Sequence, residues 1–237
     1  MRRELSEKEI LDTVRDIRHE APGIGAYKLY LMLKELYPDG MRGRDWFYGL
    51  MHESHLMLKL GKRRHTTSSN HPYRKYKNMI KGLTVNRINQ LWVADITYID
   101  TDEGVAYLHL LTDAFTHEII GWVLSDSLVA SNTVTALEMG ISHVSPLGFD
   151  GLIHHSDRGV QYCCNQYIDR LQAIKATISM TEDYKPTDNA IAERVNGIIK
   201  QEWLYRMKRP PDVVVARDLL GRIIGFYNNR RPQRSNR

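Results

Sequence analysis

The chain has 237 residues, a formal net charge of +5 and 42% hydrophobic residues, which allows one substantial core and one small additional domain. No run of 18 uncharged apolar residues occurs and the start lacks a signal-peptide core, so neither a transmembrane helix nor export is expected. Cys163 and Cys164 are the only cysteines, and two adjacent cysteines cannot build a four-ligand zinc site. We expect a reducing, cytoplasmic location.

The charge is distributed in blocks. The net charge is −1 over residues 1–58, +9 over 59–87, −11 over 88–193 and +8 over 194–237. Lysine- and arginine-rich segments bind the phosphate backbone of nucleic acids, and an acidic region attracts metal ions. We therefore interpret the chain as a nucleic-acid-binding protein with an acidic core. The alternative is that the basic segments are only solvated.

Three short helices are expected near the N-terminus. The first covers residues 6–20 and begins with a capping box of Ser6 and Glu9. The second, at 26–37, has leucines on one stripe, and the third, at 43–54, contains several large apolar residues. A tight turn between the last two favours a helix-turn-helix module, and a plain helical bundle is the alternative.

A basic linker is expected after these helices. It has nine basic residues and no acidic one. Tyr73 and Tyr76 alternate with the cations, which suits binding to a nucleic-acid backbone and stacking on its bases. A flexible solvated connection is the alternative. The candidate DNA contacts in the linker are Lys62, Arg63, Arg64, Arg74, Lys75 and Lys77.

The remainder of the chain predicts a mixed α/β core. A strand at 91–99 is apolar on both faces and is therefore expected at the centre of a sheet. Strands at 105–112 and 118–124 form a hairpin. Helices and strands then alternate, which is the plan of a mixed α/β domain. These later elements are a helix at 129–143, a strand at 152–155, a helix at 165–173, a strand at 177–180, and helices at 188–205 and 211–227.

Three acidic residues in this core are candidate metal ligands. Asp95 lies inside the first strand, Asp157 follows the fourth strand, and Glu193 lies in a helix, 35 residues beyond Asp157. No Lys or Arg occurs from residue 88 to residue 157, and a buried carboxylate without a partner is costly. A shared Mg²⁺ or Mn²⁺ would stabilise the three carboxylates, and paired ions of this kind catalyse phosphoryl transfer. Taken singly, each acid also has an ordinary structural interpretation.

The motifs around these acids resemble a known family. Segments 92–98, 155–162 and 188–193 look like the D,D-35-E signature of retroviral-integrase-like insertion-sequence transposases, and segment 226–232 resembles their C-terminal box. The resemblance is strongest to the second-frame product of the IS-three family. It covers roughly residues 20–232.

The resemblance implies a fold and a reaction. The implied fold is α/β, a ribonuclease H-like integrase core with a mixed five-stranded sheet flanked by helices, preceded by a small helix-turn-helix-like domain. The implied reaction is metal-dependent DNA strand cleavage and strand transfer, with two Mg²⁺ or Mn²⁺ ions held by Asp95, Asp157 and Glu193. The expected domain ranges are 1–57 (helical, DNA-binding), 58–87 (basic linker), 88–210 (catalytic core) and 211–237 (C-terminal helix and basic tail).

Lys200 matches the basic position of the family's third motif. It follows Glu193 by seven residues, or about two helical turns, so both side chains should leave one helix face together with Asn189 and Asn196. We expect Lys200, Asn189 and Asn196 to contact DNA. The resemblance also implies double-stranded DNA partners (element ends and target), a first-frame partner protein, a homo-oligomer on DNA and a bacterial nucleoid location.

Two departures from the family pattern define an alternative. Gln233 stands where the family usually has His, and the sequence stops at Arg237, so a truncated or inactive remnant that only binds DNA is the alternative function. His52 and His55 have the spacing of half a zinc module, but no cysteine lies near them, and no zinc is expected. A nuclease of the same fold that cuts without joining is a further possibility.

Overall fold

The computed structural model describes residues 5–58, 72–144, 148–182 and 189–233. The chain divides into two compact units. The helical unit comprises Met1–Arg64, Ile198–Lys208 and Gly221–Arg237. The sheet unit comprises His65–Gly197 and Arg209–Leu220. The candidate contacts Lys62, Arg63 and Arg64 lie outside the described residues.

The sheet unit is built on a mixed five-stranded sheet, as expected. The strand order is β3-β2-β1-β4-β5, which places β1 at the centre. β1 pairs antiparallel with β2 and parallel with β4. The strands are β1 (Leu91–Thr101), β2 (Gly104–Asp113), β3 (Ile119–Ser125), β4 (Ile153–Ser156) and β5 (Thr177–Met180).

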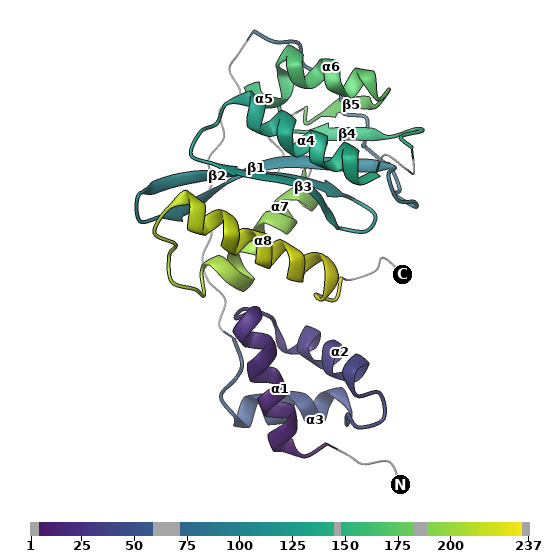
Figure 1. Ribbon diagram of the computed structural model, residues 1–237. Coiled ribbons are helices and arrows are strands. Elements are labelled where there is room, and N and C mark those ends of the chain that lie inside the picture. Colours follow the sequence, from purple (N-terminus) through teal and green to yellow (C-terminus); the bar gives the residue numbers. More distant parts are fainter. Residues whose placement is uncertain (1–4, 59–71, 145–147, 183–188, 234–237) are drawn as a thin grey trace. The chain divides into compact units, whose positions relative to one another are not determined.

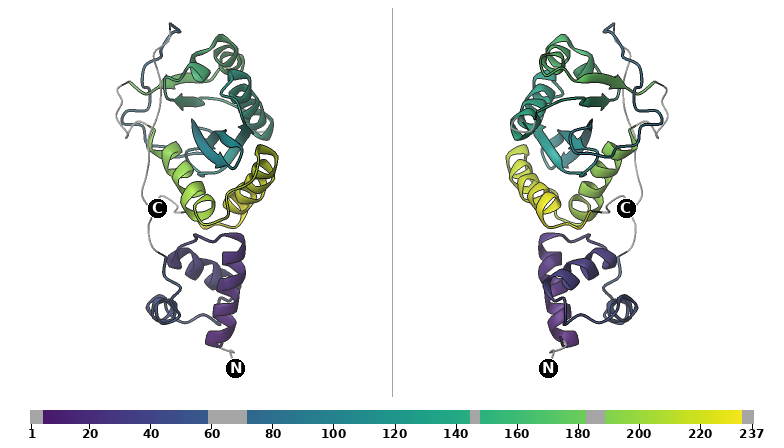
Figure 2. Two further views of the ribbon diagram at one scale, coloured as in Figure 1. Left: turned by 90° about the vertical axis from the view of Figure 1, so that its left-hand side faces the viewer. Right: turned by 90° about the vertical axis from the view of Figure 1, so that its right-hand side faces the viewer.

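Helices cover both faces of this sheet (Figures 1 and 2). On one face lie α4 (Ala130–Val144), the short α5 (Val160–Cys163) and α6 (Asn165–Ala173). On the other face lie α7 (Ala190–Ile199) and the first turns of α8 (Val213–Asn229). Within the part of the chain that the structure describes, no helix has both the length and the apolar character needed to cross a membrane.

Alternation along β1 explains how the two faces are filled. Trp92 and Ala94 belong to the larger core cluster, which also contains apolar residues of α4 and α6. Leu91 and Val93 instead pack with Ala192 of α7. Successive strand residues point to opposite faces, so Asp95 lies on the α7 face. This geometry brings the first candidate acid to the helix that carries the third.

The helical unit contains the three expected N-terminal helices. They are α1 (Glu7–Glu20), α2 (Ala26–Leu36) and α3 (Arg44–Glu53). The predicted capping box is confirmed, because the Ser6 side chain accepts from the Glu9 amide and the Glu9 carboxylate accepts from the Ser6 amide. Ile10, Leu29 and Phe47, one from each helix, are fully buried.

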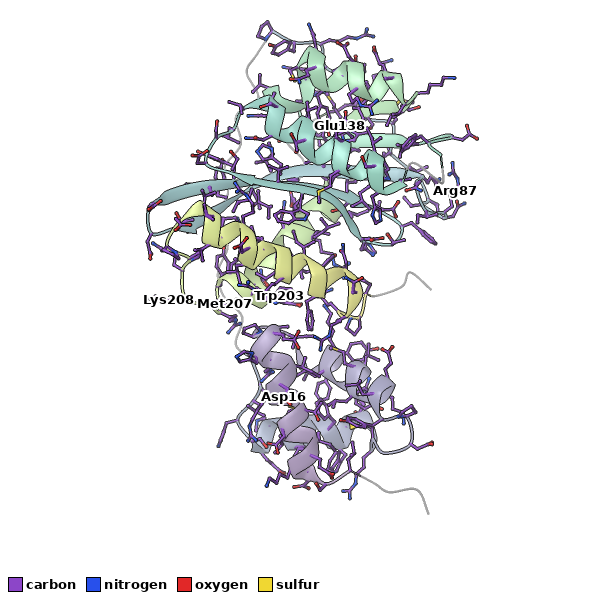
Figure 3. All side chains as sticks on the ribbon, viewed as in Figure 1. Asp16, Arg87, Glu138, Trp203, Met207 and Lys208 are labelled. Atoms are coloured by element: carbon purple, nitrogen blue, oxygen red, sulfur yellow. The ribbon has the colours of Figure 1, made fainter. Side chains whose placement is uncertain are left out.

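Two segments from the C-terminal part of the chain complete the helical unit. The helix expected to run from 188 to 205 changes at Ile199 into a π-helical turn, Lys200–Leu204. Trp203 of this turn is fully buried and donates from Nε1 to the Glu20 carbonyl at 2.8 Å (labelled in Figure 3). The end of α8 brings Arg230 into an ion pair with Glu20. Sequence periodicity does not distinguish a π-helical turn from an α-helix, so the turn was not predicted.

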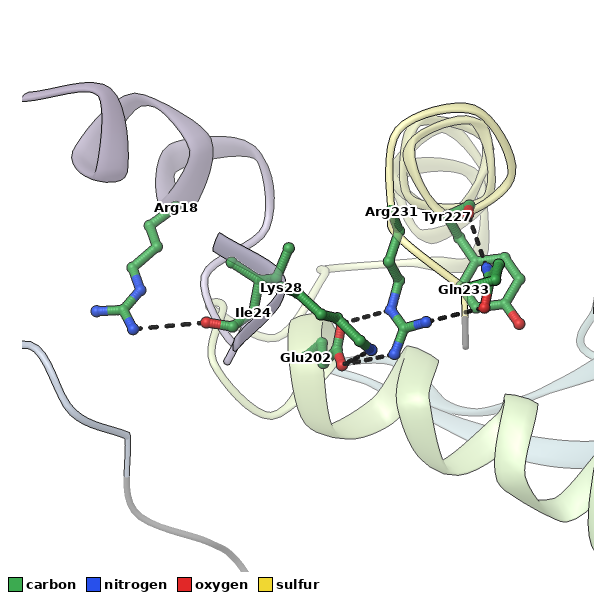
Figure 4. A network of polar contacts seen from close by, with 7 residues as sticks. All are labelled: Arg18, Ile24, Lys28, Glu202, Tyr227, Arg231 and Gln233. Carbon is green, nitrogen blue, oxygen red and sulfur yellow. Dashed lines mark hydrogen bonds and ion pairs between the residues drawn. The ribbon is translucent and has the colours of Figure 1, made fainter. Parts of the chain in front are cut away.

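A polar cluster centred on Glu202 joins these segments to the N-terminal helices (Figure 4). Glu202 accepts two hydrogen bonds from Arg231, both at 2.8 Å, and pairs with Lys28 at 3.2 Å. Its carbonyl accepts from the Gly23 amide at 2.6 Å. A Cβ at Gly23 would lie 2.4 Å from the Cα of Glu202, so only glycine fits this close approach.

Candidate active site

Asp95 and Asp157 are placed side by side by strand register. In the parallel β1–β4 pair, Val93 lies opposite His155. Extending this register by two residues puts Asp95 opposite Asp157, which directly follows β4, and the charge of Asp157 does raise the pKa of Asp95. An open α/β sheet commonly binds its ligands at the carboxyl ends of its parallel strands. The sheet therefore brings together two acids that lie far apart in the sequence.

A tight turn fixes the Asp157 side chain. Its Oδ1 accepts a hydrogen bond from the Gly159 amide at 2.8 Å. A Cβ at Gly159 would lie only 2.9 Å from that same oxygen, which explains the glycine in this Asp-Arg-Gly turn. The turn leads directly into α5, which the sequence pattern did not predict because a four-residue helix has too little periodicity to detect.

Asn196 on α7 binds Asp95 directly. Its Nδ2 donates to Oδ2 of Asp95 at 2.7 Å. On the same helix face, Asn189 donates from Nδ2 to the Ala94 carbonyl at 3.1 Å. Both asparagines are buried, and among the described residues Oδ1 of each has no hydrogen-bond partner. These amides therefore hold α7 against the acidic part of β1.

The three candidate acids interact electrostatically. Burial and, to a smaller extent, the negative charge of Asp157 raise the pKa of Asp95 to about 7. The hydrogen bond from Asn196 opposes this shift, and the charge of Glu193 adds a smaller increase in the same pKa. Ionising several neighbouring carboxyl groups costs free energy because the negative charges repel each other. Such a group of acids is typical of a site that binds a cation or a proton.

The donor chemistry fits a hard divalent cation. All three side chains offer carboxylate oxygens, and a cation would relieve the repulsion that raises the pKa of Asp95. Asn189 and Asn196 add two unpaired amide oxygens beside them. Among the residues described, however, no three His, Cys, Asp or Glu side chains converge closely enough to hold a metal ion.

The histidines before Asp157 have structural partners. Nδ1 of His155 lies 2.8 Å from the Ser179 hydroxyl, and Nε2 of His154 lies 2.9 Å from the Tyr167 hydroxyl. Burial and, to a smaller extent, the neighbouring His155 lower the pKa of His154 to about 3. His154 is therefore neutral at physiological pH and belongs to the core of the sheet unit.

The described part of the linker lies against the sheet unit. The Met180 amide donates to the Lys77 carbonyl at 3.3 Å, and Lys81 forms an ion pair with Glu182 at 2.5 Å. Arg74, Lys75 and Lys77 are exposed. Tyr76, expected to stack on bases, is partly buried against the core, with Arg74 over its ring at 5.1 Å.

Lys200 is the first residue of the π-helical turn that follows α7. Its carbonyl accepts a hydrogen bond from the Tyr205 amide at 2.8 Å, and its side chain is partly exposed. A π-helical turn inside an α-helix is frequent at functional sites. The position expected to contact DNA therefore coincides with a local change of helix geometry.

Comparison with known proteins identifies the family. Residues 85–186 and 174–236 match the integrase core domain family. The chain is 30% identical to the transposase for insertion sequence element IS904 from Lactococcus lactis, over 95% of this chain and 89% of that protein. It is 33% identical to the transposase for IS629 from Shigella sonnei, over 72% of this chain.

The coverage differs among relatives. The chain spans about half the length of several curated relatives that it matches, for example 56% of the IS629 protein. A solved structure of the simian T-cell lymphotropic virus intasome in complex with PP2A regulatory subunit B56 gamma superposes with a TM-score of 0.52 at 17% identity. That superposition covers 95% of this chain and 70% of the other, and it shows the fold. The chain belongs to the insertion-sequence transposases that carry an integrase core domain.

Proposed function

We propose that this protein is a transposase that cleaves DNA at the ends of an insertion sequence and joins the freed strand to target DNA. The observation that carries the proposal is the electrostatic coupling of Asp95 to Asp157 and Glu193 at the edge of an integrase-type sheet. An acid whose pKa is raised by burial and by neighbouring carboxylates suits a site for phosphoryl transfer with bound cations. Hydrolysis at the element end leaves a 3′-hydroxyl, which then attacks a target phosphodiester.

Each acid has a proposed role in binding divalent metal. Asp95, Asp157 and Glu193 would hold two Mg²⁺ or Mn²⁺ ions through their carboxylate oxygens. When bound, such ions activate the attacking oxygen and neutralise charge on the leaving oxygen. Asn196 fixes the Asp95 carboxylate by its 2.7 Å hydrogen bond, so that one carboxylate oxygen stays oriented for a ligand.

The basic residues are the proposed DNA contacts. Arg74, Lys75 and Lys77 are exposed on the sheet unit and available to a phosphate backbone. Lys200 is proposed to bind a phosphate beside the scissile bond. Asn189 and Asn196 are buried and each already donates one hydrogen bond from Nδ2, so a contact with DNA would use the second Nδ2 hydrogen or the unpaired Oδ1 atom. Lys62, Arg63 and Arg64 complete the proposed set.

The proposal includes the partners of the reaction. Double-stranded DNA supplies both substrates, and the N-terminal helices are proposed as a helix-turn-helix module that binds it. A first-frame partner protein and a homo-oligomer on DNA are proposed because the two element ends must be brought together. The reaction is placed in the bacterial cytoplasm, at the nucleoid.

Substitution of the acids tests the function. In Asp95→Asn, Asp157→Asn and Glu193→Gln, strand cleavage and strand transfer should be abolished, while binding to element-end DNA stays near wild type. The reason is that each change removes a metal-ligand charge and leaves the groups that bind phosphate in place. Asp169→Asn, at an exposed position on α6, is the matched control and should retain activity. Near-wild-type cleavage by any of the three variants in Mg²⁺ would remove that residue from the site.

A pre-cut end distinguishes the proposed transposase from the alternatives. A nuclease that cuts without joining would cleave the intact end but fail to transfer the pre-cut strand. A remnant that only binds DNA would shift the DNA in a binding assay and do neither. Transfer of the pre-cut strand by the wild-type chain, and not by Asp95→Asn, is the result expected for a transposase.

A further inference from the structure

The end of the basic linker is attached to an edge of the sheet. We call residues 74–83 the strap. β5 is an edge strand, and such a strand presents backbone groups that have no partner in the sheet. The Met180 amide of β5 donates to the Lys77 carbonyl of the strap at 3.3 Å. The Met79 amide of the strap donates to the Ser179 hydroxyl at 2.8 Å, so the strap covers part of this edge.

Apolar side chains of the strap pack on both faces of the sheet. Tyr76 packs against the larger core cluster, on the face covered by α4 and α6. Ile80 and Leu83 pack against the second cluster, on the face covered by α7. The strap therefore passes from one face to the other at β5. Tyr76 stands between two exposed lysines and anchors that part of the strap to the sheet unit.

Glu182 provides a further attachment, two residues after the end of β5. Its Oε1 accepts a hydrogen bond from the Asn78 amide at 3.0 Å, and its Oε2 pairs with the ammonium group of Lys81. A carboxylate beside a phosphate-binding segment repels DNA, so by itself it weakens DNA binding. Glu182 offsets this effect only through what it holds, and it uses both of its oxygens to hold the strap.

These attachments lie at the end of the sheet that carries Asp157. β4 and β5 run parallel, with Ser156 opposite Met180. The Thr181 amide donates to the Ser156 carbonyl at 3.0 Å, which continues this pairing one residue past β5. Asp157 directly follows Ser156, and Glu182 directly follows Thr181. The strap is therefore fixed next to a candidate acid of the active site.

A buried hydroxyl links the strap to the strand that leads to Asp157. Ser179 is fully buried, and its Oγ lies 2.8 Å from Nδ1 of His155. The same Oγ accepts the hydrogen bond from the Met79 amide. His155 precedes Asp157 by two residues in the chain. Ser179 thus bonds the strap and the end of β4 at one oxygen atom.

We propose that Ser179 and Glu182 are positioning residues for DNA binding. By fixing the strap on β5, they hold its cations where the phosphates next to the scissile bond pass. This inference rests on the proposed function and adds to it the way in which DNA is held. Cations on a fixed segment lose little conformational freedom when DNA binds, whereas those on a free linker must be ordered at that moment. The cations concerned are Arg74, Lys75 and Lys77.

The test measures DNA binding by variants of the full chain. Glu182→Ala removes both attachments of the carboxylate, and Glu182→Gln keeps an acceptor oxygen for the Asn78 amide. Ser179→Ala removes the acceptor for the Met79 amide. Asp169→Ala, at an exposed position on α6, is the control for the loss of one acidic charge. Fluorescence anisotropy with labelled element-end duplex, without divalent metal and over a series of salt concentrations, gives the affinity and its salt slope. The melting temperature of each variant is measured alongside.

The direction of the change in affinity separates the proposal from a simple charge effect. Removing an acid by itself raises the affinity for DNA, and Asp169→Ala should bind as well as wild type or slightly better. Glu182→Ala should instead bind several-fold more weakly. The slope of log K against log salt should fall by about 0.9 for each phosphate that the strap no longer neutralises. Ser179→Ala should change in the same direction, and Glu182→Gln should lie between Glu182→Ala and wild type.

The contrary results are equally definite. A Glu182→Ala protein with an unchanged salt slope and equal or higher affinity overturns the proposal. Lower melting temperatures with the wild-type slope would show that Ser179 and Glu182 only stabilise the fold, which also overturns it. Glu182 is partly exposed, so its variants decide the question if Ser179→Ala fails to fold.

A parallel cleavage assay keeps the proposed function distinguishable from this inference. The wild-type chain is incubated with the same element-end duplex in Mg²⁺. If it fails to cleave while the salt slopes differ as expected, the proposed function is refuted and the role of Ser179 and Glu182 in DNA binding stands. If it cleaves while the slopes are equal, only the role of Ser179 and Glu182 is refuted.

Discussion

Asn196 and Asp95, 101 residues apart in the sequence, are joined by a 2.7 Å hydrogen bond from the amide Nδ2 to the carboxylate Oδ2. The bond ties helix α7 to the central strand β1 and opposes the rise in the pKa of Asp95 caused by burial and by Asp157. A hydrogen bond donated to a carboxylate stabilises the ionised form of the acid and lowers its pKa. Asn196 therefore supports the state of Asp95 that binds a cation.

Removal of this hydrogen bond should weaken metal binding. We expect Asn196→Ala to raise the Mg²⁺ concentration needed for half-maximal cleavage by roughly 10- to 100-fold, the usual effect of losing a group that orients a metal ligand. Asn196→Gln is the comparison variant, since it keeps the amide but shifts its position. A Mg²⁺ titration of cleavage for the three proteins gives the answer. An Asn196→Ala protein with the wild-type titration curve would show that Asp95 needs no such support.

Lys200 should affect DNA binding and leave metal binding unchanged. We expect Lys200→Ala to raise the DNA concentration that half-saturates cleavage, because the variant lacks a cation that binds a phosphate. The Mg²⁺ dependence should stay near wild type, and Lys200→Arg should restore most of the DNA affinity. Cleavage rates over a range of DNA and Mg²⁺ concentrations separate the two effects. If Lys200→Ala changes only the Mg²⁺ requirement, Lys200 belongs to the metal site instead.

The linker should contribute to the salt dependence of DNA binding. Replacing Lys62, Arg63 and Arg64 by alanine should reduce the slope of log K against log salt by about 0.9 for each phosphate that the protein no longer neutralises. A charge-conserving set, with Arg at position 62 and Lys at positions 63 and 64, should retain the slope. Fluorescence anisotropy with duplex DNA at several salt concentrations measures it. An unchanged slope in the alanine variant means that this segment is only solvated.

The Glu202 cluster should be important for the stability of the helical unit. Glu202→Gln leaves the Arg231 guanidinium, only 3% exposed, without its charged partner, so we expect a loss of about 3 kcal/mol in the free energy of unfolding. Glu20→Gln removes an exposed ion pair with Arg230 and should cost less than about 1 kcal/mol. Urea unfolding of both variants tests the difference. Equal losses in the free energy of unfolding would show that the buried ion pair contributes no more to stability than the exposed one.

Buried neutral histidines should make stability depend on pH. Burial lowers the pKa of His109 to about 4, below the ordinary value of 6.5, so the unfolded chain binds a proton first as the pH falls. The stability that His109 contributes is complete above pH 6.5 and is lost as the pH falls toward 4, by up to about 1.4 kcal/mol per pH unit. Asp95, whose pKa is raised to about 7, acts in the opposite sense over the same range.

The comparison of His109→Asn with wild type isolates one histidine from these opposing effects. Urea unfolding at several pH values between 7 and 5 gives a slope for each protein. The free energy of unfolding should rise more steeply with pH in the wild type than in the variant. The difference in slope should correspond to at most one proton bound on unfolding, whatever the absolute stabilities of the two proteins. Parallel curves would mean that folding leaves the pKa of His109 unchanged.

Local sequence patterns predicted most of the sheet unit. The apolar run around Asp95 indicated a central strand, and β1 lies at the centre of the sheet. Periodicity located α6 and β5 at their observed bounds, since each has an apolar pattern ended by a clear break. The position of Asp95 followed from its place inside β1, and that of Asp157 from the end of β4.

Contacts between distant segments could not be predicted in this way. Nothing local at Asn196 indicates a bond to Asp95, because that bond depends on how α7 crosses the sheet. The buried pairing of Glu202 with Arg231 was missed for the same reason, and a glutamate on a helix is ordinarily solvated.

The shared cluster at Glu202 also has a consequence for the order in which the protein is made. Lys28 and Glu202 are separated by 174 residues, and Trp203 lies 183 residues after Glu20, whose carbonyl it binds. At synthesis rates of about 5–20 residues per second, the first helices are synthesised roughly ten to thirty-five seconds before these partners exist. The strands of the sheet unit are all translated within that interval. The N-terminal helices must therefore persist for that time with their docking surface uncovered, and the last part of the helical unit to fold joins the first part to be synthesised.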